Sequence, residues 1–171
     1  MSVLRMNPYV AVPFLLIVSL LQSTLLPRVR VGSVWPDVLL LVVMSWALLR
    51  RSNEALGWAF VGGVAVDLLS GGPFGASAIG LMIVALIAGV TAGGVFRDRT
   101  VLPIVAAFVG TLAFHGVYLL ATAFVGQRID VLDALFRIAL PSAIYNAALS
   151  WFVYRVMAAL DRRIRPKALD W

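Results

Sequence analysis

Long apolar stretches, separated by short polar breaks, follow one another along the whole chain. They run for about 15–25 residues, which is close to the length that a helix needs to cross the hydrocarbon core of a bilayer. The pattern predicts an all-α, polytopic membrane protein with six transmembrane helices in a single integral membrane domain, residues 1–171. The predicted helices cover approximately residues 8–26, 36–49, 54–69, 76–96, 101–125 and 131–160.

The second and third segments are short, because a span requires about 20 residues. Merging them into one helix would leave five spans instead of six. The break R-R-S-N-E at residues 50–54 argues against the merger, since two arginines precede Ser52 and Asn53, and either of these can cap a new helix. Two short helices can be accommodated by a thinner bilayer or by burial among longer helices.

The composition agrees with a membrane protein. Hydrophobic residues make up 62% of the 171 residues and charged residues 13%, with a mean hydropathy of +0.99. A soluble domain of this size would carry about a quarter charged residues. The chain has no cysteine, which excludes disulfides and thiol catalysis and removes the usual ligands of structural zinc.

The net charge of +6 is better explained by membrane topology than by binding to nucleic acid. With the N-terminus inside, ten lysines and arginines fall on the cytoplasmic side and four on the outer side. Positively charged flanks stay preferentially in the cytoplasm. We therefore predict that both termini are cytoplasmic.

Reactive side chains are sparse. The chain has one histidine, His115, and contains no G-x-S-x-G, H-E-x-x-H or phosphate-loop motif. One histidine and scattered carboxylates are a poor basis for a metal site. We interpret His115 and Asn146 as side chains that hydrogen-bond a neighbouring helix, each contributing about 1 kcal/mol. The sequence thus favours a protein that is not an enzyme and has no cofactor.

Polar residues of the first three helices are predicted to meet at one level on the outer side. The first helix ends there at Q-S-T-L-L-P-R, the second begins there at W-P-D, and the third ends there at D-L-L-S-G-G-P-F-G. Pro36 suits the first turn of a helix, and Asp37 suits the positive end of the helix dipole. Ser77 is expected to cap the fourth helix.

Asp67 is the unusual member of this group. It lies near the C-terminal end of a helix, where the dipole disfavours a negative charge, so we expect it to have a partner. The candidates are Arg28, the backbone N–H groups of the following turn, and a second protein. The two glycines of that turn permit tight or left-handed backbone, and the proline after them stops the helix. Whether Asp67 only fastens this turn or also binds a partner stays open.

Three stretches carry a resemblance to a known family. They are L-Q-S-T-L-L-P, W-P-D-V-L-L-L-V-V and G-G-V-A-V-D-L-L-S-G-G-P-F-G-A-S-A. Over residues 21–93 the chain resembles the family of the bacterial rod shape-determining protein MreD. From about residue 94 onward, only length and hydropathy agree.

The resemblance implies a six-helix protein of the bacterial cytoplasmic (inner) membrane with both ends inside. It implies a fold similar to the S components of energy-coupling-factor transporters, with an outward-facing cavity. It also implies direct binding to the bitopic protein MreC, and a wider complex with MreB, the glycosyltransferase RodA and a class B penicillin-binding protein. No catalytic activity is known for the family. The resemblance assigns structural or partner-contact roles to Gln22, Pro36, Asp37, Asp67, Ser70, Gly71, Gly72, Pro73 and Gly75, to which we add Arg28.

Two functional hypotheses follow. The first is a non-enzymatic membrane scaffold that binds MreC and supports peptidoglycan synthesis and rod cell shape. The alternative is an S-component-like protein that binds or transports a small molecule, with Asp37, Asp67 and the glycine turn lining a pocket open to the outside. We also expect Asp67→Ala to weaken the complex more than His115→Ala, because an ionisable group within a span is costly unless it is paired.

Overall fold

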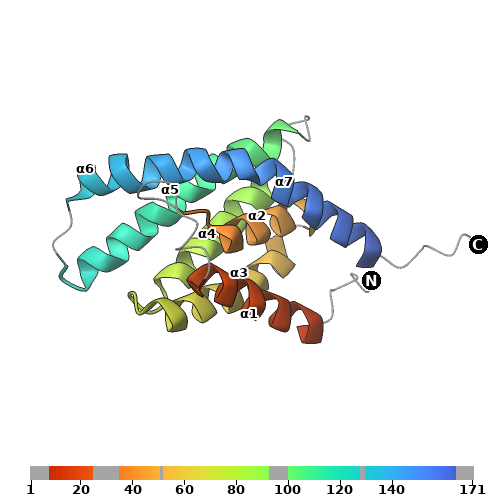
Figure 1. Ribbon diagram of the computed structural model, residues 1–171, viewed down its shortest axis with the longest axis horizontal. Coiled ribbons are helices and arrows are strands. Elements are labelled where there is room, and N and C mark those ends of the chain that lie inside the picture. The colour runs from red at the N-terminus through yellow and green to blue at the C-terminus, as the bar shows by residue number, and fades with distance from the viewer. Residues whose placement is uncertain (1–7, 25–34, 51, 93–99, 128–129, 165–171) are drawn as a thin grey trace, which may run out of the picture.

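The computed structural model describes residues 8–24, 35–50, 52–92, 100–127 and 130–164. These residues form helices and turns and contain no strand, so the all-helical prediction is confirmed. The elements, shown in Figure 1, are α1 (Pro8–Thr24), α2 (Val38–Arg50), α3 (Ser52–Ser70), α4 (Ala76–Thr91), α5 (Val101–Phe124), α6 (Val131–Ala134), the π-helical segment η2 (Leu135–Ala139) and α7 (Leu140–Ile164).

The helix boundaries lie close to the predicted ones. The second and third segments are separate elements, α2 and α3, and these two helices pack against each other, so the chain turns back between them. Helix α2 begins at Val38 rather than at residue 36, because Asp37 precedes it as a cap. Helix α4 ends at Thr91, and most of its predicted extension to residue 96 lies outside the described residues.

The sixth predicted helix is longer and less regular than expected. It is a continuous run of α6, η2 and α7, in which Leu135–Ala139 adopt a π-helical turn. Pro141 lies two residues after this turn and explains the irregularity, because proline has no N–H to donate and its ring clashes with the carbonyl four residues earlier. A local π-turn is one of the ways in which a helix relieves such a clash.

Helix α2 lies at the centre of the molecule and packs against α1, α3, α4, α5 and α7 (Figure 1). All residues from Leu39 to Ala47 are buried. A helix that is apolar on every side is stable only where other helices surround it completely. The sequence L-L-L-V-V-M-S-W-A therefore forms the core around which the other helices assemble.

The helices alternate in direction, so that the ends of α1, α3 and α5 lie together with the starts of α2, α4 and α6. A cavity opens there, and we call this the cavity end. At the opposite end, where α2 and α7 finish, Arg50 forms a buried ion pair with Asp161. The Arg50 guanidinium also lies 5.5 Å from the centre of the Trp46 ring, and Trp46 stacks on Trp58 at 4.4 Å. Contacts between α2, α3 and α7 thus close that end.

Two helices are long and apolar enough to cross a membrane. They are Val101–Phe124, with a mean hydropathy of 2.0, and the run Val131–Ile164, with 1.2. In the most apolar 18-residue stretch of each helix, only 22% and 28% of the residues are buried inside the protein, whereas the core helix of a soluble protein would be mostly buried. Large apolar side chains such as Phe124, Phe136 and Phe152 are exposed on this surface. Six spans remain a prediction.

Candidate functional site: a polar cavity between two capped helices

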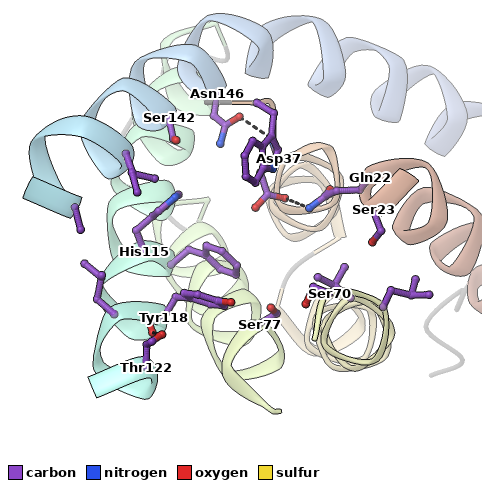
Figure 2. Close-up of a pocket in the computed structure, with 17 residues that line it drawn as sticks. Gln22, Ser23, Asp37, Ser70, Ser77, His115, Tyr118, Thr122, Ser142 and Asn146 are labelled. Atoms are coloured by element: carbon purple, nitrogen blue, oxygen red, sulfur yellow. Dashed lines mark hydrogen bonds between the residues drawn. The ribbon is translucent and has the colours of Figure 1, made fainter. Parts of the chain in front are cut away.

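A cavity of about 640 Å³ lies at the cavity end, bordered by all the long helices (Figure 2). At this end, α5 and α6 extend beyond the other helices (Figure 1). The wall of the cavity is both apolar and polar. Aliphatic and aromatic side chains alternate with the carboxylate of Asp37, the imidazole of His115, and several amides and hydroxyls. Such a cavity has the size and the wall chemistry of a small-molecule site.

Asp37 and Gln22 together cap the start of α2. The Leu40 N–H donates to Asp37 Oδ1 at 3.0 Å, and the Leu39 N–H donates to Gln22 Oε1 at 2.7 Å. The Gln22 amide also donates to Asp37 Oδ1 at 2.9 Å, which joins α1 to α2. The free N–H groups at a helix start require such acceptors, and the dipole favours a carboxylate there.

Asn146 of α7 connects the same helix start to α5. Its Oδ1 accepts from the Asp37 N–H at 3.0 Å, and its Nδ2 donates to Thr111 Oγ1 at 3.2 Å. Asn146 and Thr111 are both fully buried. Asn146 therefore joins α2, α5 and α7, in the way that the sequence indicated for a polar residue within a span. His115 differs, because its Nδ1 donates to the Thr111 carbonyl of its own helix at 2.9 Å.

We predict that Asn146→Ala lowers the free energy of unfolding by about 2 kcal/mol, because the Asp37 N–H and the Thr111 hydroxyl lose their partner inside the protein. Ser150→Ala is the matched control: Ser150 is equally buried in α7, but its hydroxyl donates to the Ala147 carbonyl of the same helix. Thermal unfolding in detergent measures both variants. Equal melting temperatures for the two would contradict the bridging role of Asn146.

Asp67 caps the start of α4 from the neighbouring helix α3. Its carboxylate accepts the N–H groups of Gly75 at 2.8 Å, Ser77 at 3.1 Å and Ala78 at 3.4 Å. The positive end of the α4 dipole thus offsets the unfavourable end of the α3 dipole. Ser77, which the sequence suggested as the cap, instead contributes its N–H, and Gly75 occupies the cap position without a side chain. Arg28, the alternative partner of Asp67, lies outside the described residues.

The turn between α3 and α4 depends on its glycines. Gly71 and Gly75 have positive φ values of 66° and 90°, a conformation that L-residues with side chains rarely adopt. Gly72 serves a different purpose, because a Cβ there would lie 2.4 Å from the Tyr118 hydroxyl of α5. The turn S-G-G-P-F-G therefore packs closely against α5, beside the cavity.

The predicted site residues that the structure describes lie around two neighbouring helix starts, those of α2 and α4. Gln22, Asp37 and Ser70 line the cavity, Pro36 is buried directly before α2, and Asp67 is buried outside the lining. The pocket of the alternative hypothesis therefore contains Asp37 but not Asp67. Gly71, Gly72, Pro73 and Gly75 build the turn that Asp67 holds.

Sequence reasoning missed the wall that α5 contributes. Polar residues of α5 recur at helical spacing and so share one face of the helix: Thr111, His115, Tyr118 and Thr122. His115, Tyr118 and Thr122 line the cavity, and Thr111 is fully buried. This helical spacing is the sequence pattern from which the polar face of α5 could have been predicted. No group of three or more histidine, cysteine, aspartate or glutamate side chains suited to a metal occurs among the described residues.

The family comparison extends well beyond the stretches that carry the resemblance. The sequence model of the rod shape-determining protein MreD matches residues 4–164. The chain belongs to the MreD family. Membership of the MreD family indicates a role in rod shape determination, and MreD is a shape-determining family that is not known for enzymes. The two long apolar helices are compatible with a membrane protein. No curated protein and no solved structure matches the chain.

Proposed function

We propose that this MreD-family protein is a non-enzymatic scaffold of the cell-elongation machinery, embedded in the bacterial inner membrane. One observation carries the proposal: the carboxylates of Asp37 and Asp67, the acidic residues of the predicted site, are both engaged as helix caps. Among the described residues, neither carboxylate accepts a hydrogen bond from a hydroxyl or an imidazole. The site thus stabilises the arrangement of helices, which is what a scaffold requires.

Insertion as six spans is supported by the apolar exterior and by the position of the short helices. Helix α2 has 13 residues and is about 20 Å long, less than the hydrocarbon thickness of about 30 Å. It need not meet lipid along its length, since the longer helices enclose it. Exposed leucine, valine and phenylalanine side chains on α1, α5 and α7 form the surface that lipid would cover.

The charge distribution supports an orientation with both ends in the cytoplasm. Arg50, Arg162 and Arg163 lie in the last turns of α2 and α7, at the opposite end from the cavity. Arg137 lies near the cavity end, where it pairs with Asp133. By the positive-inside rule, this distribution supports a cytoplasmic position for the opposite end and a cavity that faces outward.

Within this role we propose direct binding to MreC, and through it association with MreB, RodA and a class B penicillin-binding protein to support peptidoglycan synthesis. We predict that tagged protein, co-expressed with MreC from the same bacterium and extracted in mild detergent, retains MreC through affinity and size-exclusion steps. An unrelated tagged membrane protein of similar size is the control. Repeated loss of MreC from correctly folded protein would overturn the proposal.

The cavity supports the second candidate, a small-molecule binding or transport function similar to that of S components. A volume of about 640 Å³ is sufficient for a compact organic ligand. Native mass spectrometry of the purified protein tests this function through any ligand that is retained. If the cavity never retains a ligand under any lipid or small-molecule condition, this candidate is ruled out and the scaffold is unaffected.

A further inference from the structure

We infer that the cavity binds a primary ammonium group, carried either by a lipid headgroup or by a free small amine, with Asp37 as its counter-charge. The inference deepens the second candidate function, because it names the chemical class of the ligand. It does not depend on binding to MreC.

The charge of the wall is the first reason. Among the described residues that line the cavity, Asp37 is the sole carboxylate, and there is no lysine or arginine. Its Oδ1 holds the start of α2, but its Oδ2 receives no hydrogen bond from the residues that the structure describes, and in Figure 2 the carboxylate reaches the edge of the cavity. A half-satisfied carboxylate at a cavity wall attracts a cation with N–H donors.

The surrounding acceptors are the second reason. His115 donates from Nδ1 to a carbonyl, so in the neutral imidazole the other nitrogen, Nε2, is an acceptor. His115 lines the cavity from the side of α5 (Figure 2). The hydroxyls of Ser77, Tyr118 and Ser142 also line it and make no side-chain hydrogen bond within the described part of the chain. An ammonium group has three N–H donors to distribute among such acceptors.

The aromatic and aliphatic parts of the wall are the third reason. Trp35, Phe114 and Tyr118 line the cavity, and the Phe114 and Tyr118 rings are stacked with their centres 6.4 Å apart. Aromatic faces stabilise cations, and more strongly when water is displaced. Val66, Leu69 and Ile138 offer apolar contact to the remainder of an amphiphilic ligand. The hydrogen-bond acceptors favour a primary ammonium over a quaternary one, which has no N–H.

The test uses the full-length protein in nanodiscs with equal amounts of phosphatidylethanolamine, phosphatidylcholine and phosphatidylglycerol, and native mass spectrometry of the lipids that remain bound after release. Free ethanolamine, titrated by calorimetry into detergent-solubilised protein, separates the small-amine source from the lipid source. We expect retention of phosphatidylethanolamine over the other two lipids, or binding of ethanolamine. Asp37→Asn should weaken this binding about tenfold or more, because the charged hydrogen bond is lost.

Asp37→Asn keeps an oxygen that can accept from Leu40 and from Gln22, so the cap of α2 is retained. Asp130→Asn is the matched control, since Asp130 caps α6 in the same way but does not line the cavity. Tyr118→Phe provides a second variant, which removes one hydroxyl acceptor and should weaken binding by a smaller factor. Equal retention of all three lipids without ethanolamine binding, or unchanged binding in Asp37→Asn, overturns the inference. Retention of a ligand without an amine also overturns it but supports the second candidate function.

Discussion

Gly63→Ala is expected to separate α3 from α4 and to lower the free energy of unfolding by about 3 kcal/mol. A Cβ at this position would lie 2.3 Å from the Ala78 Cα and 2.6 Å from the Ala78 nitrogen. These are backbone atoms of the facing helix, so no side-chain rotation can relieve the overlap. The shift would also stretch the hydrogen bond from the Ala78 N–H to Asp67, which is already 3.4 Å long.

Gly57→Ala provides the control within the same helix, because nothing lies within 4 Å of a Cβ added there. This variant should be neutral or more stable by about 0.5–1 kcal/mol, since alanine favours helix over glycine. Tryptophan fluorescence during thermal unfolding in detergent can measure both variants, as the chain has five tryptophans. Equal melting temperatures for Gly63→Ala and Gly57→Ala would contradict the close approach of α3 and α4.

Asp67→Ala is expected to have the second large effect, a loss of about 3 kcal/mol together with most of the co-purified MreC. The substitution leaves the N–H groups of Gly75, Ser77 and Ala78 without their acceptor at a buried helix start. The glycine turn then loses the contact that holds it against α3. Because the cavity end is then disordered, we expect the variant to bind less MreC as well as to be less stable.

His115→Ala is the comparison, and its effect should be smaller. The His115 ring bonds a carbonyl of its own helix, and that carbonyl can keep its backbone partner when the ring is removed. Folded protein recovered after size exclusion, and MreC per mole of that protein, are the two readouts. Wild-type values of both for Asp67→Ala and His115→Ala alike would show that the Asp67 cap has no such importance.

Features that depend on short stretches of sequence could be predicted. The helices follow from long apolar runs, and the break between α2 and α3 follows from arginines and cap-forming residues at 50–54. The need of Asp67 for a partner follows from its position at the end of α3, and the N–H groups of the following turn and of the α4 start supply it. The glycines at 71 and 75 adopt the positive φ that such a turn requires.

Features that depend on distant residues could not be predicted in the same way. Asn146 accepts a hydrogen bond from a backbone N–H that lies 109 residues earlier in the chain, so no local pattern identifies its partner. The π-turn at Leu135–Ala139 responds to Pro141 within a helix that continues on both sides. From the sequence alone, a helix that ends before Pro141 would have been an equally good prediction.

The sequence by itself determined that this chain is all-helical and apolar, with polar residues gathered at one end of its first three helices. Helix formation and hydropathy are local properties, so short stretches of sequence are sufficient to predict them. The tertiary structure decided how those polar residues are used. Packing around α2 places Gln22 and Asp37 at one helix start and Asp67 at another, and brings the polar face of α5 opposite them. The carboxylate left half-satisfied beside the cavity is that of Asp37, whereas both oxygens of Asp67 accept hydrogen bonds at the start of α4.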